Sequence, residues 1–226
     1  MEPLLPLPPI IYNDFFNEHV APADMDLLWS QGWRHFGDHF FRNSLHIEYG
    51  RWQLIIPLRI RLTAFAPSKS QRRVWRKNVD LVTTVGPAVV TDDLREMFER
   101  HKARFDENVP DDLSNFLGLA PEKGPCDTWV LRCLCEGRTI AASFFDLGQC
   151  GMSSIYGIFD PEFSDRSLGI FTMLWEMEFG RQRGLEFYYP GYATVEPSRY
   201  DYKKQFAATE SYDWIAERWS PLPRLV

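Results

Sequence analysis

The clearest pattern of apolar and polar positions lies in the second half of the chain. Three runs rich in β-branched and aromatic residues span 128–135, 138–146 and 152–159, separated by Glu136-Gly137 and by a glycine-containing segment at 147–151. Apolar runs joined by such short turns predict consecutive antiparallel strands. We therefore expect a three-stranded meander in this region.

A long helix and a further strand follow the meander. The apolar positions have the i, i+3, i+4, i+7 spacing of one helix face: Ile170, Met173, Leu174 and Met177. The helix is expected to begin near Ser167 and to end at 181–184, where a glycine is typical of a helix C-terminus. Residues 185–189 have the composition of a strand. Glu178 lies on this helix among apolar neighbours, so we expect it to pair with a buried arginine.

Weaker patterns in the first half predict further helices and strands. Helices are expected at 22–32, 71–77, 91–105 and 111–119. Their candidate caps are Asp24 and the stop Gly32 for the first, Ser68 or Ser70 for the second and Thr91 for the third. Two strand-like segments, 33–42 and 52–65, are expected to pair with each other.

Two proline-rich segments mark breaks in organisation. Residues 1–23 are predicted to lie irregularly across the surface, and residues 121–125 interrupt the chain before the meander. We therefore predict either one large domain or an N-terminal lobe of residues 1–125 and a C-terminal lobe of residues 126–226, with a boundary near Val79 as the alternative.

Charge is distributed unevenly in this chain of 226 residues, whose formal net charge is −6. Between Arg51 and Val79 there is no Asp or Glu, while the same interval contains these cations: Arg51, Arg59, Arg61, Lys69, Arg72, Arg73, Arg76 and Lys77. A local basic surface on an acidic body suits one anionic partner and repels polyanions elsewhere. This pattern argues against a general nucleic-acid coat protein.

The chain has no apolar run long enough for a membrane helix, which needs about 18 residues or more. Residues 1–9 are acidic and proline-rich and lack the basic start of a signal peptide. We expect a soluble, cytoplasmic protein with no membrane partner.

Cysteine and histidine give little indication of a metal site. The four cysteines, at 126, 133, 135 and 150, form no Cys-x-x-Cys pair, and Cys133 and Cys135 would share one face of a strand as small apolar residues. His46 and Glu48 suit a surface strand. His35, His39 and His101 have no evident partner and are expected to be structural or surface residues.

The loop before the long helix is a candidate anion site. Arg166-Ser-Leu-Gly169 places a glycine and unpaired backbone N–H groups at the start of the helix, where phosphate binds favourably. By itself this signal is weak, because such a glycine more often serves close packing or a turn.

The order of meander, loop, helix and strand is similar to the core of GNAT acyltransferases. Seven further blocks occur in the order typical of aminoacyl-tRNA-protein transferases: Gly32-Trp-Arg-His-Phe-Gly, Pro57-Leu-Arg-Ile, Ala66-Pro-Ser-Lys-Ser-Gln-Arg-Arg-Val-Trp-Arg-Lys-Asn78, Tyr156-x-x-Phe-Asp-Pro161, Arg166-Ser-Leu-Gly169, Tyr189-x-Gly-Tyr192 and Tyr202-Lys-x-Gln-Phe206. The chain resembles this family over about residues 27–206. The family includes arginyltransferases and bacterial leucyltransferases that act on proteins with acidic N-termini.

The resemblance implies an α/β fold of GNAT-like acyltransferase architecture, with a mixed, mostly antiparallel sheet flanked by helices. It also implies transfer of arginine or leucine from charged tRNA to the N-terminal amine of an acceptor protein, in an N-degron pathway. The expected partners are aminoacyl-tRNA, as co-substrate without another cofactor, and acceptors with acidic N-terminal residues. Family members usually carry N-terminal cysteine pairs, which are missing here. We therefore expect no metal or iron–sulfur site, and acceptor specificity stays open.

Such a reaction needs no nucleophilic side chain, because an amine attacks an ester that is already activated. It needs a proton acceptor, a donor for the developing oxyanion and contacts for the tRNA end. Asp160 is a candidate to orient or deprotonate the amine, or equally to cap a turn. Tyr192 and Tyr202 are candidate oxyanion donors, with aromatic packing as the alternative for both.

Substrate binding is expected from two groups of residues. In the basic segment they are Arg59, Ser70, Gln71, Arg72, Arg73 and Arg76; in the second half they are Arg166, Ser167, Leu168, Gly169, Lys203 and Gln205. Gln71 and the paired arginines suit either tRNA phosphates or the carboxylate of an acidic N-terminal residue. Lys203 and its neighbour Lys204 suit phosphates or a solvated surface.

Two other functions fit the same sequence. A GNAT enzyme that uses acyl-CoA would hold a pyrophosphate at Arg166 to Gly169. A peptide-binding protein without catalysis would be consistent with the missing cysteines.

Overall fold

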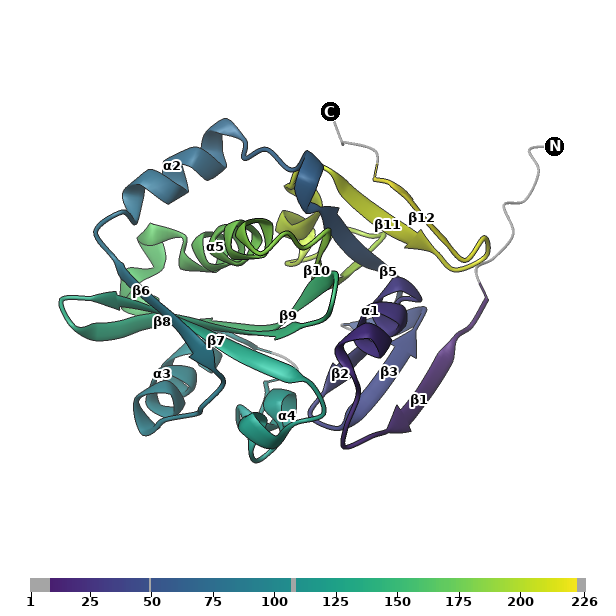
Figure 1. Ribbon diagram of the computed structural model, residues 1–226, viewed down its shortest axis with the longest axis horizontal. Helices are drawn as coiled ribbons and strands as arrows, with labels where there is room; N and C mark the ends of the chain where they lie inside the picture. The colour runs from purple at the N-terminus through teal and green to yellow at the C-terminus, as the bar shows by residue number, and fades with distance from the viewer. Residues whose placement is uncertain (1–8, 49, 107–108, 223–226) are drawn as a thin grey trace.

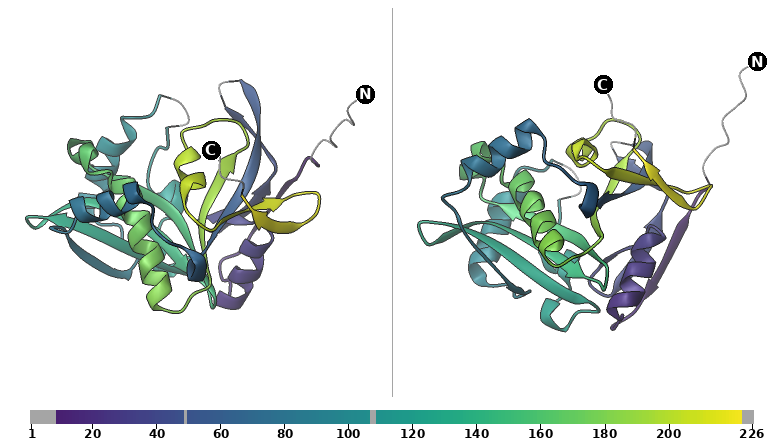
Figure 2. Two further views of the ribbon diagram at one scale, coloured as in Figure 1. Left: turned by 90° about the horizontal axis from the view of Figure 1, so that it is seen from above. Right: turned by 45° about the horizontal axis from the view of Figure 1, so that its top comes forward.

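A computed structural model describes residues 9–48, 50–106 and 109–222 of the chain (Figures 1 and 2). A large mixed sheet forms its centre, with helices on both faces and a small sheet beside it. The predicted fold class, a mostly antiparallel sheet flanked by helices, is confirmed. Among the described residues, no helix is long and apolar enough to cross a bilayer.

The large sheet has the strand order β12-β11-β5-β10-β9-β8-β7-β6, and β4 pairs with β5. Its strands are β4 (Leu45–Glu48), β5 (Arg51–Arg61), β6 (Val82–Pro87), β7 (Asp127–Cys135), β8 (Arg138–Leu147), β9 (Gly151–Phe159), β10 (Phe187–Thr194), β11 (Thr209–Asp213) and β12 (Arg218–Pro221). The predicted meander is confirmed as β7-β8-β9, and among the described strands only β9 and β10 pair in parallel. Strands from both sides of the predicted lobe boundary share this sheet.

The small sheet has the order β1-β3-β2 and lies beside helix α1 (Pro22–Ser30). Its strands are β1 (Tyr12–Phe16), β2 (Arg34–Phe36) and β3 (His39–Asn43). Two expectations were wrong here. Residues 12–16 form a strand rather than irregular chain, and segment 33–42 folds on itself as β2-β3 instead of pairing with β5. The first residues of β5 pair with β4, and its later residues lie between β10 and β11, so distant strands rather than segment 33–42 pair with them.

Helices cover the two faces of the large sheet separately (Figure 1). Helices α5 (Leu168–Gln182) and α2 (Lys69–Lys77) lie on one face, and α3 (Asp92–Lys102) and α4 (Ser114–Leu117) lie on the other. Four short 3₁₀ helices complete the connections: η1 (Leu62–Ala64), η2 (Pro121–Lys123), η3 (Pro161–Arg166) and η4 (Asp201–Gln205). All four predicted helices of the first half are therefore present, although the fourth has only 4 residues.

Alternation along β8 explains the two-sided packing. Ala141 and Phe145 face the core beneath α5, whereas Ala142 and Phe144 face the core beneath α3 and α4. Successive side chains of a strand point to opposite faces, so a strand covered on both faces must be apolar throughout.

Two of the predicted N-caps behave differently from expectation. Helix α1 begins at Pro22, with Ala21 in the cap position, because proline is preorganised for the first helical position; Asp24 lies inside the first turn. Thr91 occupies the N-cap of α3, but its hydroxyl bonds to the Asp93 carboxylate instead of a backbone N–H. Gly32 has the positive φ of +82° expected of the residue after α1.

Candidate active site

The parallel strands β9 and β10 separate within the large sheet, and we call the place where they part the fork. The two strands pair at Phe187–Gly151, Tyr188–Met152 and Tyr189–Ser153 and not beyond. Each strand also has an irregular register against its other neighbour. In the pairing of β9 with β8, the register shifts between Phe144 and Phe145 of β8. In the pairing of β10 with β5, it shifts between Tyr188 and Gly191 of β10. Strands that part in this way leave backbone polar groups in need of partners, and bulges are frequent beside active sites.

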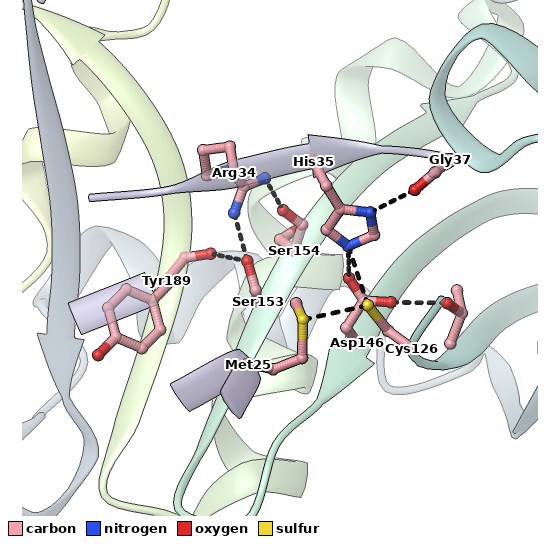
Figure 3. A network of polar contacts seen from close by, with 10 residues as sticks. Met25, Arg34, His35, Gly37, Cys126, Asp146, Ser153, Ser154 and Tyr189 are labelled. Atoms are coloured by element: carbon pink, nitrogen blue, oxygen red, sulfur yellow. Dashed lines mark hydrogen bonds and ion pairs between the residues drawn. The ribbon is translucent and has the colours of Figure 1, made fainter. Parts of the chain in front are cut away.

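Arg34 of β2 fills the fork from the small sheet. Its guanidinium donates to the hydroxyl of Ser153 and to the backbone carbonyl of Ser154, and Figure 3 shows it pointing at both. Burial lowers the pKa of Arg34, while nearby Tyr192 and Asp146 oppose that shift. A guanidinium stays protonated in proteins, so Arg34 supplies a permanent positive charge to the fork.

Glu176 enters the fork from α5. Its side chain is 0 % exposed, and one carboxylate oxygen accepts the Tyr188 hydroxyl at 2.7 Å. The other oxygen, Oε1, has no hydrogen-bond partner within the described part of the chain. Burial raises the pKa of Glu176 to about 7, although the hydroxyls of Ser143 and Tyr188 favour the ionised form. Near neutral pH the carboxyl is therefore only partly ionised.

Lys203 of η4 closes the fork from a third direction. Its Nζ donates to the Tyr192 carbonyl at 3.3 Å and lies 5.1 Å from the centre of the Tyr200 ring. Burial, helped by the charge of Arg34, lowers the pKa of Lys203 to about 7. An amine with this pKa exists in both protonation states near neutral pH, as a general base requires.

The two cations converge on Gly191. A Cβ built there would lie 3.4 Å from both Arg34 Nη2 and Lys203 Nζ, and the residue has a φ of +94°. Only glycine combines this backbone with free approach of both cations. The preceding Pro190 lacks a backbone N–H, which suits a position where the ladder is interrupted.

The solvent side of the fork is aromatic. Tyr202 is 37 % exposed, and burial of its hydroxyl raises its pKa to about 12. Burial likewise raises the pKa of Tyr156 to about 12, while the neighbouring Arg104 opposes the shift. Both phenols therefore keep their protons at neutral pH and act as hydrogen-bond donors.

The three residues predicted to be catalytic have different surroundings. Asp160 caps η3: burial would raise its pKa, but the Glu162 backbone N–H, Arg100 at 3.1 Å and Arg138 lower it overall. Tyr192 donates its hydroxyl to the Gly32 carbonyl at 2.7 Å. Tyr202 is 37 % exposed and lies within electrostatic reach of Glu176. Catalytic roles for these three residues stay predictions.

Within the basic interval from Arg51 to Val79, residues Lys69–Lys77 form α2, which lies beside α5 (Figures 1 and 2). Gln71 and Ser68 cap the helix reciprocally, with Ser68 N to Gln71 Oε1 at 2.8 Å and Gln71 N to Ser68 Oγ at 3.3 Å, so Gln71 is buried. Ser70 bonds to the Ser68 hydroxyl at 2.9 Å. The cap predicted at Ser68 or Ser70 is thus Ser68, and its partner Gln71 contributes to helix stability.

Two of the three arginines of α2, Arg72 and Arg76, line a groove. Arg72 donates to the Pro67 carbonyl at 2.6 Å, Arg76 donates to the Arg72 carbonyl at 3.3 Å, and Arg73 is exposed. A cavity of about 670 Å³ separates α2 from α5, and we call it the basic groove. It is lined by Phe65, Pro67, Gln71, Arg72, Trp75, Arg76, Leu174, Met177, Glu178, Arg181 and Gln182.

The other predicted binding residues are dispersed. Arg166 pairs with Asp80 at 2.9 and 3.0 Å, and Ser167 adopts a left-handed conformation at the start of α5, followed by a buried Leu168 and an exposed Gly169. Arg59 pairs with Glu210 at 2.6 Å and stacks on two aromatic rings. Gln205 is exposed at the end of η4. Binding roles for these residues stay predictions.

The sequence missed the buried partners in the fork. Arg34 lies in the Gly-Trp-Arg-His block, one of the blocks that carry the family resemblance. Its place in that block was the available indication that Arg34 belongs to the site. The expectation for Glu178 was wrong: it pairs with the exposed Arg181 at 2.8 Å, while Glu176, two residues earlier, is buried near Arg34. Both glutamates lie in an apolar run, so only the packing of α5 distinguishes them.

Comparisons with known proteins bear on this site. The family model described as "Arginine-tRNA-protein transferase, C terminus" matches residues 93–213. An aspartate/glutamate leucyltransferase of Marinobacter nauticus is 33% identical, with 85% of this chain and 81% of that one covered. Another, of Stenotrophomonas maltophilia, is 29% identical, with 90% and 82% covered. A solved domain of a proposed lysylphosphatidylglycerol synthetase from Agrobacterium fabrum has a TM-score of 0.50 at 14% identity, with 82% of this chain and 55% of that one covered, and supports the fold alone.

Proposed function

The chain belongs to the arginine-tRNA-protein transferase family, and we propose that it transfers leucine from charged tRNA to the α-amine of a protein whose first residue is acidic. Relatives named aspartate/glutamate leucyltransferase support leucine as the group donated. Aminoacyl-tRNA is the only co-substrate in this proposal.

The reaction exchanges an ester for an amide. The acceptor amine attacks the carbonyl carbon that joins leucine to the terminal ribose, the ester C–O bond breaks, and the ribose oxygen leaves with a proton. An α-amine has a free pKa of about 8, so a nearby base must hold it neutral or remove its proton during attack. Because the ester is activated, holding the two substrates in place supplies much of the rate.

The proposal rests on Lys203. It is a lysine whose pKa of about 7 lies near the working pH, and it stands at an opening between two diverging strands. In its neutral form it accepts the proton of the acceptor amine. Tyr202, which keeps its proton, is the donor best placed on the solvent side to stabilise the developing oxyanion.

An acidic first residue fits the charge of the fork. Arg34 and Lys203 approach the same face of Gly191, and Arg34 keeps its charge at all working pH values. The side-chain carboxylate of Asp or Glu would pair with Arg34 through charge-assisted hydrogen bonds, while Lys203 in its neutral form takes the proton of the amine. In this assignment the acceptor binds at the fork, and α2 takes no part in its recognition.

The basic groove suits the RNA of the donor. Exposed arginines and the aromatic rings of Phe65 and Trp75 occur together there, the combination that binds backbone phosphates and unpaired bases. Leu174, Glu178 and Arg181 line it, and at about 100° per residue these positions point away from Glu176. The groove and the fork therefore lie on opposite sides of α5.

The test is a transfer assay with the full-length protein. Peptides beginning with Asp, Glu or Ala are incubated with tRNA charged with labelled leucine or arginine, and products are identified by mass. We expect leucine on the Asp and Glu peptides alone. Transfer of arginine would contradict leucine as the group donated, and equal labelling of the Ala peptide would contradict selectivity for acidic acceptors. Acetyl transfer from acetyl-CoA without transfer from tRNA would overturn the proposal.

A further inference from the structure

Next to the fork, four side chains from separate parts of the fold converge on one point (Figure 3). Met25 comes from α1, His35 from β2, Cys126 from the residue before β7, and Asp146 from β8. His35 Nε2 lies 2.6 Å from Asp146 Oδ2 and 3.5 Å from Cys126 Sγ, and Cys126 Sγ lies 3.2 Å from Met25 Sδ. The donor atoms of His35, Cys126 and Asp146 all lie within 4.8 Å of one another.

This arrangement is not a nucleophilic triad. In a triad, the base binds the nucleophile through one ring nitrogen and the orienting carboxylate through the other. Here Cys126 and Asp146 both face Nε2, while Nδ1 lies 2.8 Å from the Gly37 carbonyl oxygen. Nitrogen, sulfur and oxygen donors around one point are instead the ligand types of a zinc site.

We propose that His35, Cys126 and Asp146 bind a zinc ion that fixes the small sheet to the large one. The inference rests on these contacts and is independent of the proposed transfer reaction. It differs from the expectation, drawn from cysteine spacing, that the chain has no metal site.

The distances are close to those that zinc requires. Zn–S of about 2.3 Å and Zn–N of about 2.0 Å in a tetrahedron place sulfur and nitrogen about 3.5 Å apart, and the distance between Cys126 Sγ and His35 Nε2 is 3.5 Å. The His35 Nε2–Asp146 Oδ2 distance of 2.6 Å is shorter than in a zinc site, because these two atoms form a hydrogen bond. It must open by less than about 1 Å to admit the metal.

Outer contacts orient two of the ligands. The Nδ1–H of His35 donates to the Gly37 carbonyl, which directs the Nε2 lone pair at the cluster. Thr128 donates its hydroxyl to Asp146 Oδ1 at 2.6 Å, which leaves Oδ2 for the ion. Histidine and carboxylate ligands of zinc are usually held in this way.

Burial and charge also favour an ion. His35 is 4 % exposed and Asp146 is 0 % exposed, so water does not compete strongly at these positions. A zinc ion bound to one carboxylate, one thiolate and one neutral imidazole is electrically neutral, which suits a buried site. Met25, itself buried, covers the sulfur side. Because His35 follows Arg34, the ion would also hold Arg34 in the fork.

The experiment measures zinc on the full-length protein after chelation and zinc titration. We expect one zinc per chain by mass spectrometry, an unfolding temperature that rises with zinc, and a cobalt derivative with a thiolate charge-transfer band. Cys126→Ala should abolish the cobalt band and weaken zinc binding at least about tenfold. Cys150→Ala, which removes an exposed thiol outside the cluster, should change none of these readouts.

A second variant covers the case in which Cys126→Ala fails to fold. Thr128→Val removes only the hydroxyl that holds Asp146 and should weaken zinc binding about 10–100-fold. Absence of stoichiometric zinc on the unmodified protein, or zinc bound equally by Cys126→Ala, would overturn the proposal. So would a cobalt band lost in Cys150→Ala.

Discussion

The fork and the basic groove lie on opposite sides of α5 and differ in almost every physical property. In the fork, a few charged groups are buried, and burial moves the pKa values of Glu176 and Lys203 toward 7 from opposite directions. In the groove, the cations are exposed arginines of helix α2. Desolvation makes groups suited to proton transfer, whereas solvated cations suit binding of a long polyanion. We therefore expect the two regions to separate in mutational experiments.

The largest effect is expected from Lys203. Lys203→Arg keeps a positive charge but removes a group that can lose its proton, so single-turnover transfer should fall about 10²–10⁴-fold. Preference for acidic acceptors should remain. Lys204→Arg is the matched control, because Lys204 lies in the same 3₁₀ helix and pairs with Asp201 at 2.8 Å. Equal losses in both variants would contradict the assignment.

Glu176 should make stability depend on pH. Its pKa is raised in the folded protein, so its stabilising contribution is present below its unfolded pKa and is lost as pH rises through about 7. Relative to Glu176→Gln, the unmodified protein should lose about 2–3 kcal/mol of unfolding free energy between pH 5 and 7, measured by urea denaturation. Glu178→Gln, at a surface position on the same helix, should show no such difference.

The pH dependence of transfer distinguishes Lys203 from the substrate amine. With both substrates saturating, the single-turnover rate should rise about tenfold per pH unit and level off above about 7, the pKa of Lys203. A midpoint near 8, unchanged in Lys203→Met, would assign the titration to the acceptor amine instead.

The smallest effects are expected in the groove. Arg72→Ala and Arg76→Ala should each weaken tRNA binding a few-fold and reduce the slope of log affinity against log salt by about one, with the rate at saturation unchanged. Arg95→Ala, which removes an exposed cation of α3 on the other face of the sheet, is the control. Loss of the preference for acidic acceptors in Arg72→Ala would instead indicate that α2 binds the acceptor.

Much of the local structure was predictable because its causes are local. The apolar spacing of α5, the turns of the meander and the capping pair Ser68 and Gln71 lie within a few residues of the elements that they specify. The position of β5 was not predictable in this way. Besides the neighbouring β4, its partners are β10 and β11, more than a hundred residues away, and no local pattern indicates that they would flank it.

The same distinction between local and long-range causes applies to the candidate site. By itself the sequence determined the local elements and the family blocks, which include Arg34, Lys203 and the arginines of α2. Only the tertiary structure decided which of these groups become buried together. Glu176 and Glu178 are two residues apart, yet one is enclosed between α5 and the sheet and the other pairs with Arg181 at the surface. A pKa depends on the solvent and charges around a group, and the pKa of Lys203 is lowered first by burial and then by the charge of Arg34, which is far away in the chain.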